Sequence, residues 1–373
     1  MKIVINALSA RLGGGQTYLK NLFAHLPAQP DLDIILYAQQ SLQLPEDRRI
    51  RRPTTLWSTK NPILRTAWEK LVLPRVLANE KAQVLFCPGG VITSRTPIGC
   101  KTVTMFRNMI PFDPVALAQI PFGFQKVRNF LLKRVMLRSM ATADITIFIS
   151  CHAQRLIQAL VPVRNPVMIT HGIGPAFRTH GKDTKRPGWV PDGEYLLYVS
   201  RFDSYKHQYE VALAFTQLPK ELFNRYKLLF VGEADNEMAI RVLELARNSN
   251  LESSIVVVGP IAYADLPGAY HHATVNLFAS SCENCPNILL EALGAGRPVL
   301  SSNVMPMPEF GAGAVEYFTP TDPKSICNAL VRVLEDDERS KELAALAARR
   351  SADFDWARTS RATWEQIASL VKA

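Results

Sequence analysis

The chain has 373 residues, enough for two domains that each bury a core, and 47% of its residues are apolar. No apolar run approaches the roughly 18 residues of a membrane span, which excludes a bundle of transmembrane helices. The chain opens with the strand pattern MKIVINAL, so we expect no secretory signal, and its six scattered cysteines indicate a reduced compartment. We therefore expect a cytoplasmic protein.

The charge is distributed unevenly along the chain. Residues 1–180 carry 23 Lys and Arg against 8 Asp and Glu, a balance of +15, and the remainder carries 20 against 25, a balance of −5. Such asymmetry predicts that the first half faces a polyanion or an anionic membrane. Nucleic acid is the alternative partner, but the sequence has no zinc-finger spacing, no aromatic RNA-binding motif and no low-complexity basic tail. We therefore favour a membrane surface and expect no nucleic acid.

Strand and helix patterns alternate along the chain, which predicts parallel sheets with helices on both faces. In the first half, strands are predicted at 2–8, 32–38, 83–89, 101–106, 144–150 and 166–172. Helices are predicted there at about 15–26, 63–78, 121–140 and 152–160.

Three glycines, Gly13, Gly14 and Gly15, follow the first strand and would let a ligand approach the backbone closely. The segment lacks the dinucleotide spacing G-x-G-x-x-G and an acidic residue about twenty positions further on. A flexible turn therefore explains these glycines as well as a ligand loop does.

The predicted helix over 122–140 mixes apolar residues with the basic residues Lys126, Arg128, Lys133, Arg134 and Arg138. Placed at about 100° per residue, the two kinds do not separate onto opposite faces, as they do in a surface-seeking amphipathic helix. A partly buried helix whose basic side chains reach solvent is an equal alternative to a membrane-binding helix.

A segment rich in glycine, proline and charge, residues 174–194, predicts an interdomain linker. Strand patterns then resume at 195–200, 226–232, 254–259, 274–280 and 297–302. The predicted fold class is α/β, with two Rossmann-like doubly wound domains and a ligand cleft between them, at the carboxyl ends of the strands.

We expect an N-terminal domain over 1–178, a C-terminal domain over 179–355 and a tail helix over 356–373. The tail has helical spacing, with Trp356, Trp364, Ile367 and Leu370 able to pack inward.

Two cations, Arg201 and Lys206, follow a strand in YVSRFDSYKH. At the carboxyl end of a strand they could clamp a diphosphate, the guanidinium as a fork and the ammonium as a point charge. A solvated loop with ordinary charges is the alternative.

Two glutamates flank a predicted helix start in ENCPNILLEALGAGRPV. Pro286 suits the first turn of a helix, so Glu283 falls in the preceding loop and Glu291 a little over one turn inside the helix. The free N–H groups and the positive dipole at that helix end attract phosphate. Acceptor-only side chains beside a phosphate site predict hydrogen bonds to the hydroxyls of a sugar or a ribose.

Other motifs have ordinary explanations. The CENC motif at 282–285 lacks a second ligand pair, so we interpret its cysteines as packing residues rather than as a metal or redox site. The acidic run at 31–33 is interpreted as a solvated turn, and the one at 335–339 as an exposed helix boundary. His271 and His272 are interpreted as structural. We expect no metal and no cofactor.

Together these motifs resemble those of the retaining glycosyltransferases of family 4, which have the two-domain GT-B fold. The resemblance spans nearly the entire chain, and its most specific part is Glu283, seven intervening residues and then Glu291. Supporting features are the early glycines, SRFDSYKH, FVGEAD around the substrate-binding position Gly232, and the Trp-containing tail. In that family the tail helix crosses back onto the first domain.

The resemblance implies catalytic and donor-binding roles. Arg201 and Lys206 would hold the diphosphate of a nucleotide-sugar donor and offset charge on the leaving group. Glu283 would bind hydroxyls of the transferred sugar, and Glu291 would bind the ribose hydroxyls.

Main-chain positions are implied as well. The N–H groups around Asn287, Ile288 and Leu289 would face the phosphates or the sugar. Gly14 and Gly15 would form the opposing wall, from the first domain.

One departure concerns a histidine that many members place after the fourth first-domain strand, in a pattern like His-Asp-x-x-Pro. Here MFRNMIPF puts Arg107 at that position, with Asn108 next. The role of the imidazole is therefore not carried over. Arg107 either contacts a phosphate or an anionic acceptor, or is structural.

The resemblance implies transfer of a sugar, with retention, to a glycan or lipid-linked acceptor in polysaccharide biosynthesis. Positioning and electrostatic stabilisation of the leaving diphosphate would supply the catalysis, without a metal or a protein nucleophile. Two alternatives are a nucleotide-sugar epimerase on a similar fold and a non-catalytic nucleotide-sugar-binding scaffold. Acceptor-dependent release of free nucleotide separates a transferase from an epimerase.

Overall fold

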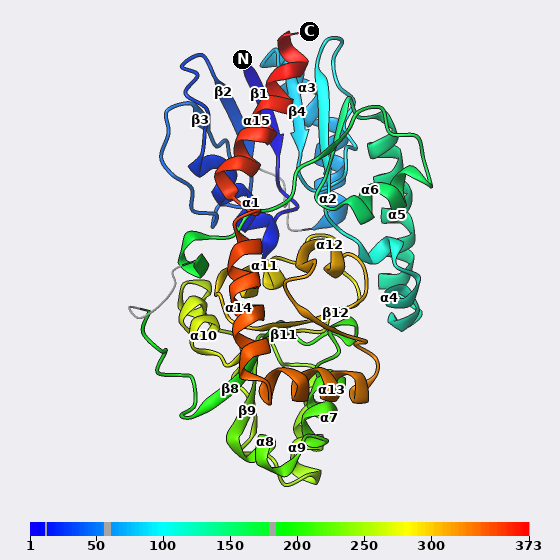
Figure 1. Cartoon of the computed structure of the whole chain (residues 1–373). Coiled ribbons are helices and arrows are strands. Elements are labelled where there is room, and N and C mark those ends of the chain that lie inside the picture. Colours follow the sequence, from blue (N-terminus) through cyan, green and yellow to red (C-terminus); the bar gives the residue numbers. More distant parts are fainter. Residues whose placement is uncertain (12, 56–60, 179–183, 373) are drawn as a thin grey trace. The chain divides into compact units, whose positions relative to one another are not determined.

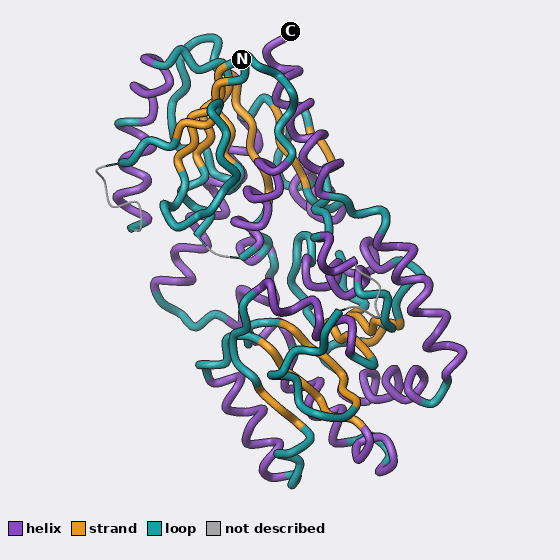
Figure 2. The backbone as a smooth tube through the Cα atoms, turned by 90° about the vertical axis from the view of Figure 1, so that its left-hand side faces the viewer, coloured by secondary structure: helices purple, strands orange, loops and turns teal. Residues whose placement is uncertain are grey.

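The chain divides into two compact units (Figure 1). The first comprises Met1–Gly172 and Trp356–Ala373, and the second comprises Ile173–Asp355. In each unit the strands gather into one layer with helices on either side (Figure 2). The computed structural model describes residues 1–11, 13–55, 61–178 and 184–372. Residues 179–183, which fall within the predicted linker, lie outside the described residues.

The first unit is built on a parallel sheet in the order β3-β2-β1-β4-β5-β6-β7. Its strands are β1 (Lys2–Asn6), β2 (Asp33–Tyr37), β3 (Ile50–Arg51), β4 (Val84–Cys87), β5 (Lys101–Phe106), β6 (Ile145–Phe148) and β7 (Pro166–Met168). Apart from the short β3, they are the apolar runs predicted from the sequence. The strand order reverses between β1 and β4, which is where ligands bind in sheets of this kind.

The helices of the first unit are α1 (Gly14–Ala24), α2 (Pro62–Leu71), α3 (Leu73–Asn79), α4 (Pro114–Gln119), α5 (Phe124–Thr142), α6 (Cys151–Gln158) and α15 (Trp356–Lys372). The single helix predicted over 63–78 is instead two helices. Pro74 lies in the first turn of α3, where its missing N–H is tolerated, whereas inside one continuous helix it would remove a hydrogen bond.

The last helix, α15, packs against α1. Trp364 Nε1 donates to the carbonyl oxygen of Leu22 over 3.2 Å, and Ser360 Oγ donates to the same oxygen over 3.0 Å. The hydroxyls of Tyr18 and Thr363 lie 3.3 Å apart. These contacts tie the end of the chain to its first helix.

The apolar face of α15 matches the predicted pattern. Trp356, Trp364 and Ile367 are buried, and Leu370 is partly buried. The Trp364 ring also packs edge-on against Phe23 of α1, with ring centroids 6.2 Å apart.

The second unit is built on a parallel sheet in the order β10-β9-β8-β11-β12-β13. Its strands are β8 (Glu194–Val199), β9 (Tyr226–Val231), β10 (Ile255–Val257), β11 (Val275–Phe278), β12 (Val299–Ser302) and β13 (Glu316–Phe318). Its helices are α7 (Gln208–Thr216), α8 (Lys220–Arg225), α9 (Glu237–Asn248), α10 (Leu266–His272), α11 (Asn287–Gly294), α12 (Met307–Gly311), α13 (Pro323–Leu334) and α14 (Asp337–Ser351). Every strand was predicted except β13.

The segment over 174–194 does not stand apart from the second unit. Phe177 lies in a short 3-10 turn, and it and Val190 are buried in the hydrophobic core of that unit. The glycines and prolines of this segment therefore border packed side chains.

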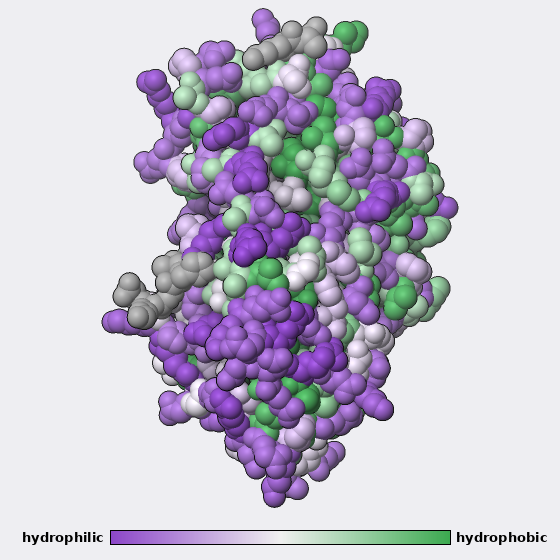
Figure 3. Space-filling model, viewed as in Figure 1, coloured by the Kyte–Doolittle hydropathy of each residue, from purple (hydrophilic) through white to green (hydrophobic). Residues whose placement is uncertain are grey.

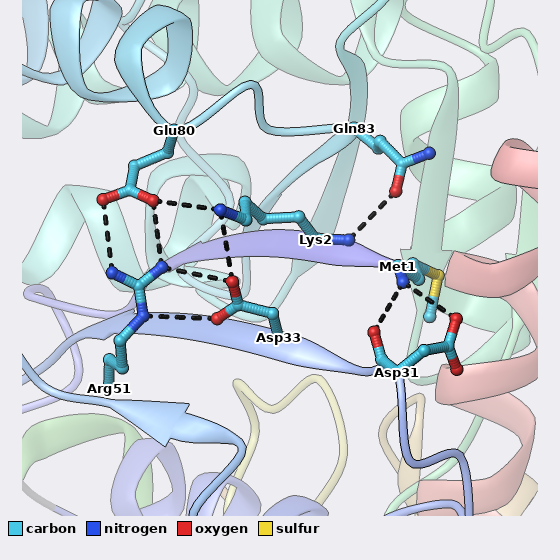
Figure 4. Close-up of polar contacts among 7 residues, drawn as sticks. All are labelled: Met1, Lys2, Asp31, Asp33, Arg51, Glu80 and Gln83. Atoms are coloured by element: carbon cyan, nitrogen blue, oxygen red, sulfur yellow. Dashed lines mark hydrogen bonds and ion pairs between the residues drawn. The ribbon is translucent and has the colours of Figure 1, made fainter.

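At the amino edge of the first sheet, two cations and two carboxylates form a closed network (Figure 4). Lys2 Nζ lies 3.2 Å from both Asp33 Oδ2 and Glu80 Oε2. Arg51 Nη2 lies 3.2 Å and 2.9 Å from the same two oxygens. Asp33 begins β2 and is engaged in ion pairs, so the interpretation of 31–33 as a solvated turn is wrong for Asp33. Asp31 does lie in a turn, with its side chain 76% exposed.

Replacing Trp364 by Ala is expected to lower the free energy of unfolding of the first unit by about 3–5 kcal/mol, because it removes a buried ring and its hydrogen bond. Differential scanning calorimetry measures the change. Phe122→Ala is the matched control, since Phe122 is 92% exposed. Equal stability of the two variants would show that the Trp364 ring and its hydrogen bond do not stabilise the unit.

Candidate active site

The candidate site begins where β8 and β11 end. These strands are parallel neighbours, so their carboxyl ends meet at one edge of the second sheet. After β8 the chain forms a loop and a 3-10 turn, η3 (Ser204–Lys206), and after β11 it forms a loop that leads into α11. Arg201 and Lys206 lie on the first connection, and Glu283 lies on the second. The predicted position of Glu283 in the strand-to-helix loop is confirmed.

The ammonium of Lys206 is buried and forms an ion pair with Glu283. The rings of Tyr205 and Phe278 have their centroids 5.3 Å and 5.4 Å from Nζ. Both rings can stabilise a cation through their faces. Burial and the ion pair hold the ammonium in place with little surrounding water, and its charge is balanced by Glu283.

Hydrogen bonds fasten the two connections together. Ser281 N donates to the carbonyl oxygen of Tyr205 over 2.8 Å, and the His207 Nε2 and Ser281 Oγ atoms lie 2.9 Å apart. The hydroxyl of Tyr198, on β8, donates to the carbonyl oxygen of Lys206. Sequence reasoning missed these positioning residues, because nothing in their spacing indicates that the two connections touch.

Arg201 differs from Lys206 in its environment. Its side chain is 62% exposed, and its Nε lies 3.0 Å from Asp203 Oδ2. Gln208 Nε2 donates to the carbonyl oxygen of Arg201 over 2.8 Å, which fixes the backbone at this position. The main chain at Arg201 is therefore held in place, whereas its guanidinium group is exposed to solvent.

Glu291 is buried in α11 beneath two tyrosines. The hydroxyl of Tyr263 donates to Oε1 over 2.8 Å, and the hydroxyl of Tyr270 donates to Oε2 over 3.4 Å. Burial raises the pKa of Glu291 to about 7, although the two tyrosine hydroxyls act to lower it. The tyrosines come from the segment before β11, and no sequence signal linked them to this carboxylate.

Gly232 follows β9 in a backbone conformation with φ of +151°. A Cβ at this position would lie 2.2 Å from the carbonyl oxygen of Ser200, so only glycine lets the loop approach the end of β8.

The first turn of α11 follows the loop that holds Glu283. Asn287 N donates to the carbonyl oxygen of Cys285 over 3.0 Å, and Pro286 at the N-cap makes no side-chain cap hydrogen bond. The start of a helix carries main-chain N–H groups and the positive end of the helix dipole.

Of the predicted first-domain residues, Gly14 and Gly15 lie at the start of α1 and Arg107 contacts this helix. Gly14 begins this helix, and a Cβ on Gly15 would lie 3.1 Å from the Ala10 Cβ. The Arg107 guanidinium stacks 5.2 Å from the ring centroid of Tyr18, which is on the same helix. Asn108 accepts a hydrogen bond from Ile110 N over 3.2 Å in a local turn.

The motifs interpreted as ordinary are explained by their contacts. The two ring nitrogens of His271 lie 3.3 Å and 3.2 Å from main-chain oxygens of Ala295 and Ala176, which confirms a structural role. Cys282 and Cys285 carry free thiols. Among the residues that the structure describes, no three His, Cys, Asp or Glu side chains gather as metal ligands would.

Known proteins are similar to this chain in sequence. The family described as "Glycosyl transferases group 1" matches residues 181–350. "Serotype-specific mannosyltransferase WbdA" of Escherichia coli is 25% identical over 280 residues. The matched region covers 73% of this chain and 34% of that protein, so the chain spans about a third of this relative.

Solved structures share its fold. Sucrose-phosphate synthase from Thermosynechococcus elongatus superposes with a TM-score of 0.76 at 18% identity, covering 99% of this chain and 98% of that one. Anabaena Alr3699/HepE, solved in complex with UDP-glucose, gives 0.72 at 16% identity and covers 99% and 100%. The predicted GT-B fold is confirmed by these superpositions.

Replacing Glu291 by Gln is expected to remove a pH dependence of stability. In the unfolded chain this carboxyl has its ordinary pKa of 4.5, and in the folded protein about 7. The folded state therefore binds more protons between these values, and wild-type stability falls as the pH rises through them. Relative to wild type, the variant should gain on the order of 3 kcal/mol between about pH 5 and about pH 8.

Urea denaturation of both proteins at the two pH values measures this gain. Glu252→Gln, at an exposed position, is the control and should show no such change with pH. A constant difference between wild type and Glu291→Gln would mean that Glu291 is ionised across the range.

Proposed function

The chain belongs to the group 1 glycosyl transferases, and we propose that it moves a hexose from a nucleoside diphosphate sugar to a sugar acceptor in polysaccharide biosynthesis, with retention. The observation that carries this proposal is the ion pair between the buried Lys206 and the partly buried Glu283 at the carboxyl edge of the second sheet. It offers a cation for a diphosphate and a carboxylate for sugar hydroxyls at one place. Because the relative from Escherichia coli is named as a mannosyltransferase, mannosyl donors are the first to test.

In this proposal the donor diphosphate lies against Lys206 and the main-chain N–H groups around Asn287, Ile288 and Leu289, in the first turn of α11. Glu283 exchanges its ion pair with Lys206 for hydrogen bonds to the transferred sugar, while the diphosphate takes its place beside the ammonium. Arg201, which is exposed and paired with Asp203, turns toward the diphosphate as a second cation. These cations offset the charge that develops on the leaving group.

Glu291 holds the ribose of the donor. It lies in α11 one turn beyond the helix start, so a nucleotide whose phosphates meet the N–H groups of the first turn places its ribose near this carboxylate. Tyr263 and Tyr270 fix the orientation of the carboxylate through their hydroxyls. Gly232 leaves room for the nucleotide beside the end of β9.

Retention follows when the acceptor attacks from the face that the diphosphate leaves. The leaving diphosphate takes up the acceptor proton, so the positioning of both substrates and the positive field supply the catalysis. We assign donor binding to residues 179–355 and acceptor binding to residues 1–178. The helix over 356–373 supports the acceptor-binding domain. Gly14, Gly15, Arg107 and Asn108 belong to the acceptor side.

The surface of α4 and α5 supports peripheral binding to an anionic membrane. Residues 114–143 contain no Asp or Glu. Phe122 and Phe124 are 92% and 78% exposed, and Val127 and Phe130 are also exposed among basic side chains. Apolar atoms are visible at the surface over these helices, at the right-hand edge of Figure 3. None of the described helices is long and apolar enough to cross a membrane.

In the alternative basic cluster over 48–52, three of the four arginines make contacts inside the unit. Arg49 Nη2 lies 2.7 Å from Asp47 Oδ2, and Arg51 is part of the amino-edge network. Arg52 donates to main-chain oxygens of Leu42 and Gln39. We therefore assign membrane docking to α4 and α5.

Replacing Lys206 by Ala is expected to reduce sugar transfer by the equivalent of about 2–4 kcal/mol of transition-state stabilisation, because a preorganised cation is lost. A screen of UDP, GDP and dTDP sugars by thermal shift first identifies the donor, and acceptor-dependent nucleotide release measures turnover. Lys220→Ala, at an exposed lysine of the same unit, is the control. Normal turnover by Lys206→Ala would remove the clamp from the mechanism.

The same assay separates the proposal from its alternatives. An epimerase converts the nucleotide sugar without an acceptor, and a scaffold binds it without turnover. Either result contradicts a transferase.

Replacing both Phe122 and Phe124 by Ser is expected to reduce co-sedimentation with anionic vesicles, because apolar insertion is lost while charge is kept. Each basic side chain near the surface contributes roughly 1 kcal/mol, so binding should also weaken as salt rises. Ile240→Ser, at an exposed apolar residue of the second unit, is the control. Equal binding to neutral and anionic vesicles, or binding to neither, would contradict docking by charge.

A further inference from the structure

Tyr263 combines an anchored hydroxyl with an open aromatic ring. It begins a short 3-10 turn, η4 (Tyr263–Asp265), on the connection between β10 and α10. Its hydroxyl donates to Glu291 Oε1 over 2.8 Å, yet the residue is 48% exposed. The side chain is therefore held at its polar end, while a large part of its ring faces solvent.

Packing against a buried ring holds Tyr263 from one side. The centroids of the Phe177 and Tyr263 rings lie 5.3 Å apart, with the ring planes tilted by 52°. Phe177 is 1% exposed, and it also packs edge-on against Tyr270, with ring centroids 5.5 Å apart. Such aromatic contacts fix the relative orientation of the rings. The exposed part of Tyr263 is thus a fixed surface of the second unit.

This degree of exposure sets Tyr263 apart from the other aromatic residues of its unit. Among the phenylalanine, tyrosine and tryptophan residues described at 173–178 and 184–355, only Tyr263 is exposed. The others, such as Tyr195 and Tyr198, are buried or partly buried. Covering an apolar ring surface with another apolar surface is favourable. The open ring therefore suits a flat apolar ligand group.

The ring lies at the edge of the sheet that carries the proposed donor site. Strands β9 and β10 are parallel neighbours, so their carboxyl ends meet at this edge. The connections that follow them touch, because Gly232 N donates to the carbonyl oxygen of Gly259 over 2.9 Å. Tyr263 comes four residues after Gly259, on the same connection.

A nucleotide at the proposed donor site has one group without a protein partner. Lys206 and the start of α11 are assigned to the diphosphate and Glu291 to the ribose, which leaves the base. In a nucleotide the base is attached to the ribose carbon beside those that carry the hydroxyls. When Glu291 holds these hydroxyls, the base comes within reach of a ring whose own hydroxyl lies 2.8 Å from the same carboxylate.

We propose that the open face of the Tyr263 ring is the platform on which the base of the donor nucleotide stacks. The inference rests on the proposed function, to which it adds a subsite for the base. The Tyr263 hydroxyl orients the ribose-binding carboxylate, and the ring of the same residue binds the neighbouring base. Because every base has a π-face, stacking of this kind accepts both pyrimidines and purines.

Calorimetric titration of the full chain with UDP and with GDP tests the platform. Tyr263→Leu, which removes the ring, should weaken binding of both nucleotides about tenfold or more, and Tyr263→Phe, which keeps it, should retain most of the affinity. Tyr317→Leu is the matched control, since Tyr317 is a partly exposed tyrosine of β13 whose hydroxyl donates to the carbonyl oxygen of Ala312 over 2.8 Å. It should bind as wild type does.

Saturation-transfer NMR with UDP separates stacking from a merely structural role. In wild type and Tyr263→Phe, the base protons should receive strong saturation from the protein. In Tyr263→Leu, their signal should fall relative to that of the ribose protons, whereas a structural defect would lower both signals alike. Tyr263→Gln, whose amide can still donate to Glu291, provides a second ring-free variant if Tyr263→Leu fails to fold.

The outcomes distinguish the platform from the donor site. Wild-type affinity of Tyr263→Leu for both nucleotides overturns the platform, as does an equal loss in Tyr263→Leu and Tyr263→Phe, which would assign the effect to the hydroxyl. In either case, weaker nucleotide binding by Lys206→Ala leaves the donor site in place. Wild-type protein that binds neither UDP nor GDP contradicts the proposed function itself, and the platform with it.

Discussion

Parallel strand pairing determines where polar side chains gather in this protein. In a parallel sheet all strands end at the same edge, so the connections that follow neighbouring strands meet there even when they are far apart in sequence. In the second unit this constraint brings Lys206, which follows β8, to Glu283, which follows β11. In the first unit it brings Asn6, at the end of β1, to Thr93, beyond β4, through their shared partner Glu69. The positions of both polar groups therefore follow from the parallel arrangement of the strands.

The sequence predicts elements well where one physical signal is strong. Most of the apolar runs that became strands are buried on both faces, so their composition alone identifies them. Pro286 likewise marks the start of α11 and separates a loop glutamate from a helix glutamate. β3 and β13 were not predicted, because each is only two or three residues long and includes a charged residue, so neither forms an apolar run. Each forms because it pairs with a longer neighbouring strand, β2 for β3 and β12 for β13.

The contacts that shape the site were less predictable, for a different reason. The hydroxyls of Tyr263 and Tyr270 reach Glu291 from a segment that precedes β11, so the partnership depends on tertiary packing. The mixed pattern over 122–140 left open a buried or a surface helix. The structure combines the two, because α5 buries Met136 and Met140 while phenylalanines near its start stay exposed. A helical projection superimposes all residues of a helix, so it cannot show that one end is exposed while the other end is buried.

The return of α15 to the first unit makes that unit discontinuous, since residues 173–355 intervene between its two parts. During synthesis the second unit is complete before α15 emerges, so it can fold first. Its own ends then lie side by side, because Ile173 N donates to the carbonyl oxygen of Phe354 over 3.1 Å and Ile173 forms a parallel bridge with Asp355. Folding of the insert thereby replaces a long flexible loop with a short closed one, which removes most of the entropy that α15 would lose in finding α1. The inserted unit acts as a template that brings the two parts of its host together.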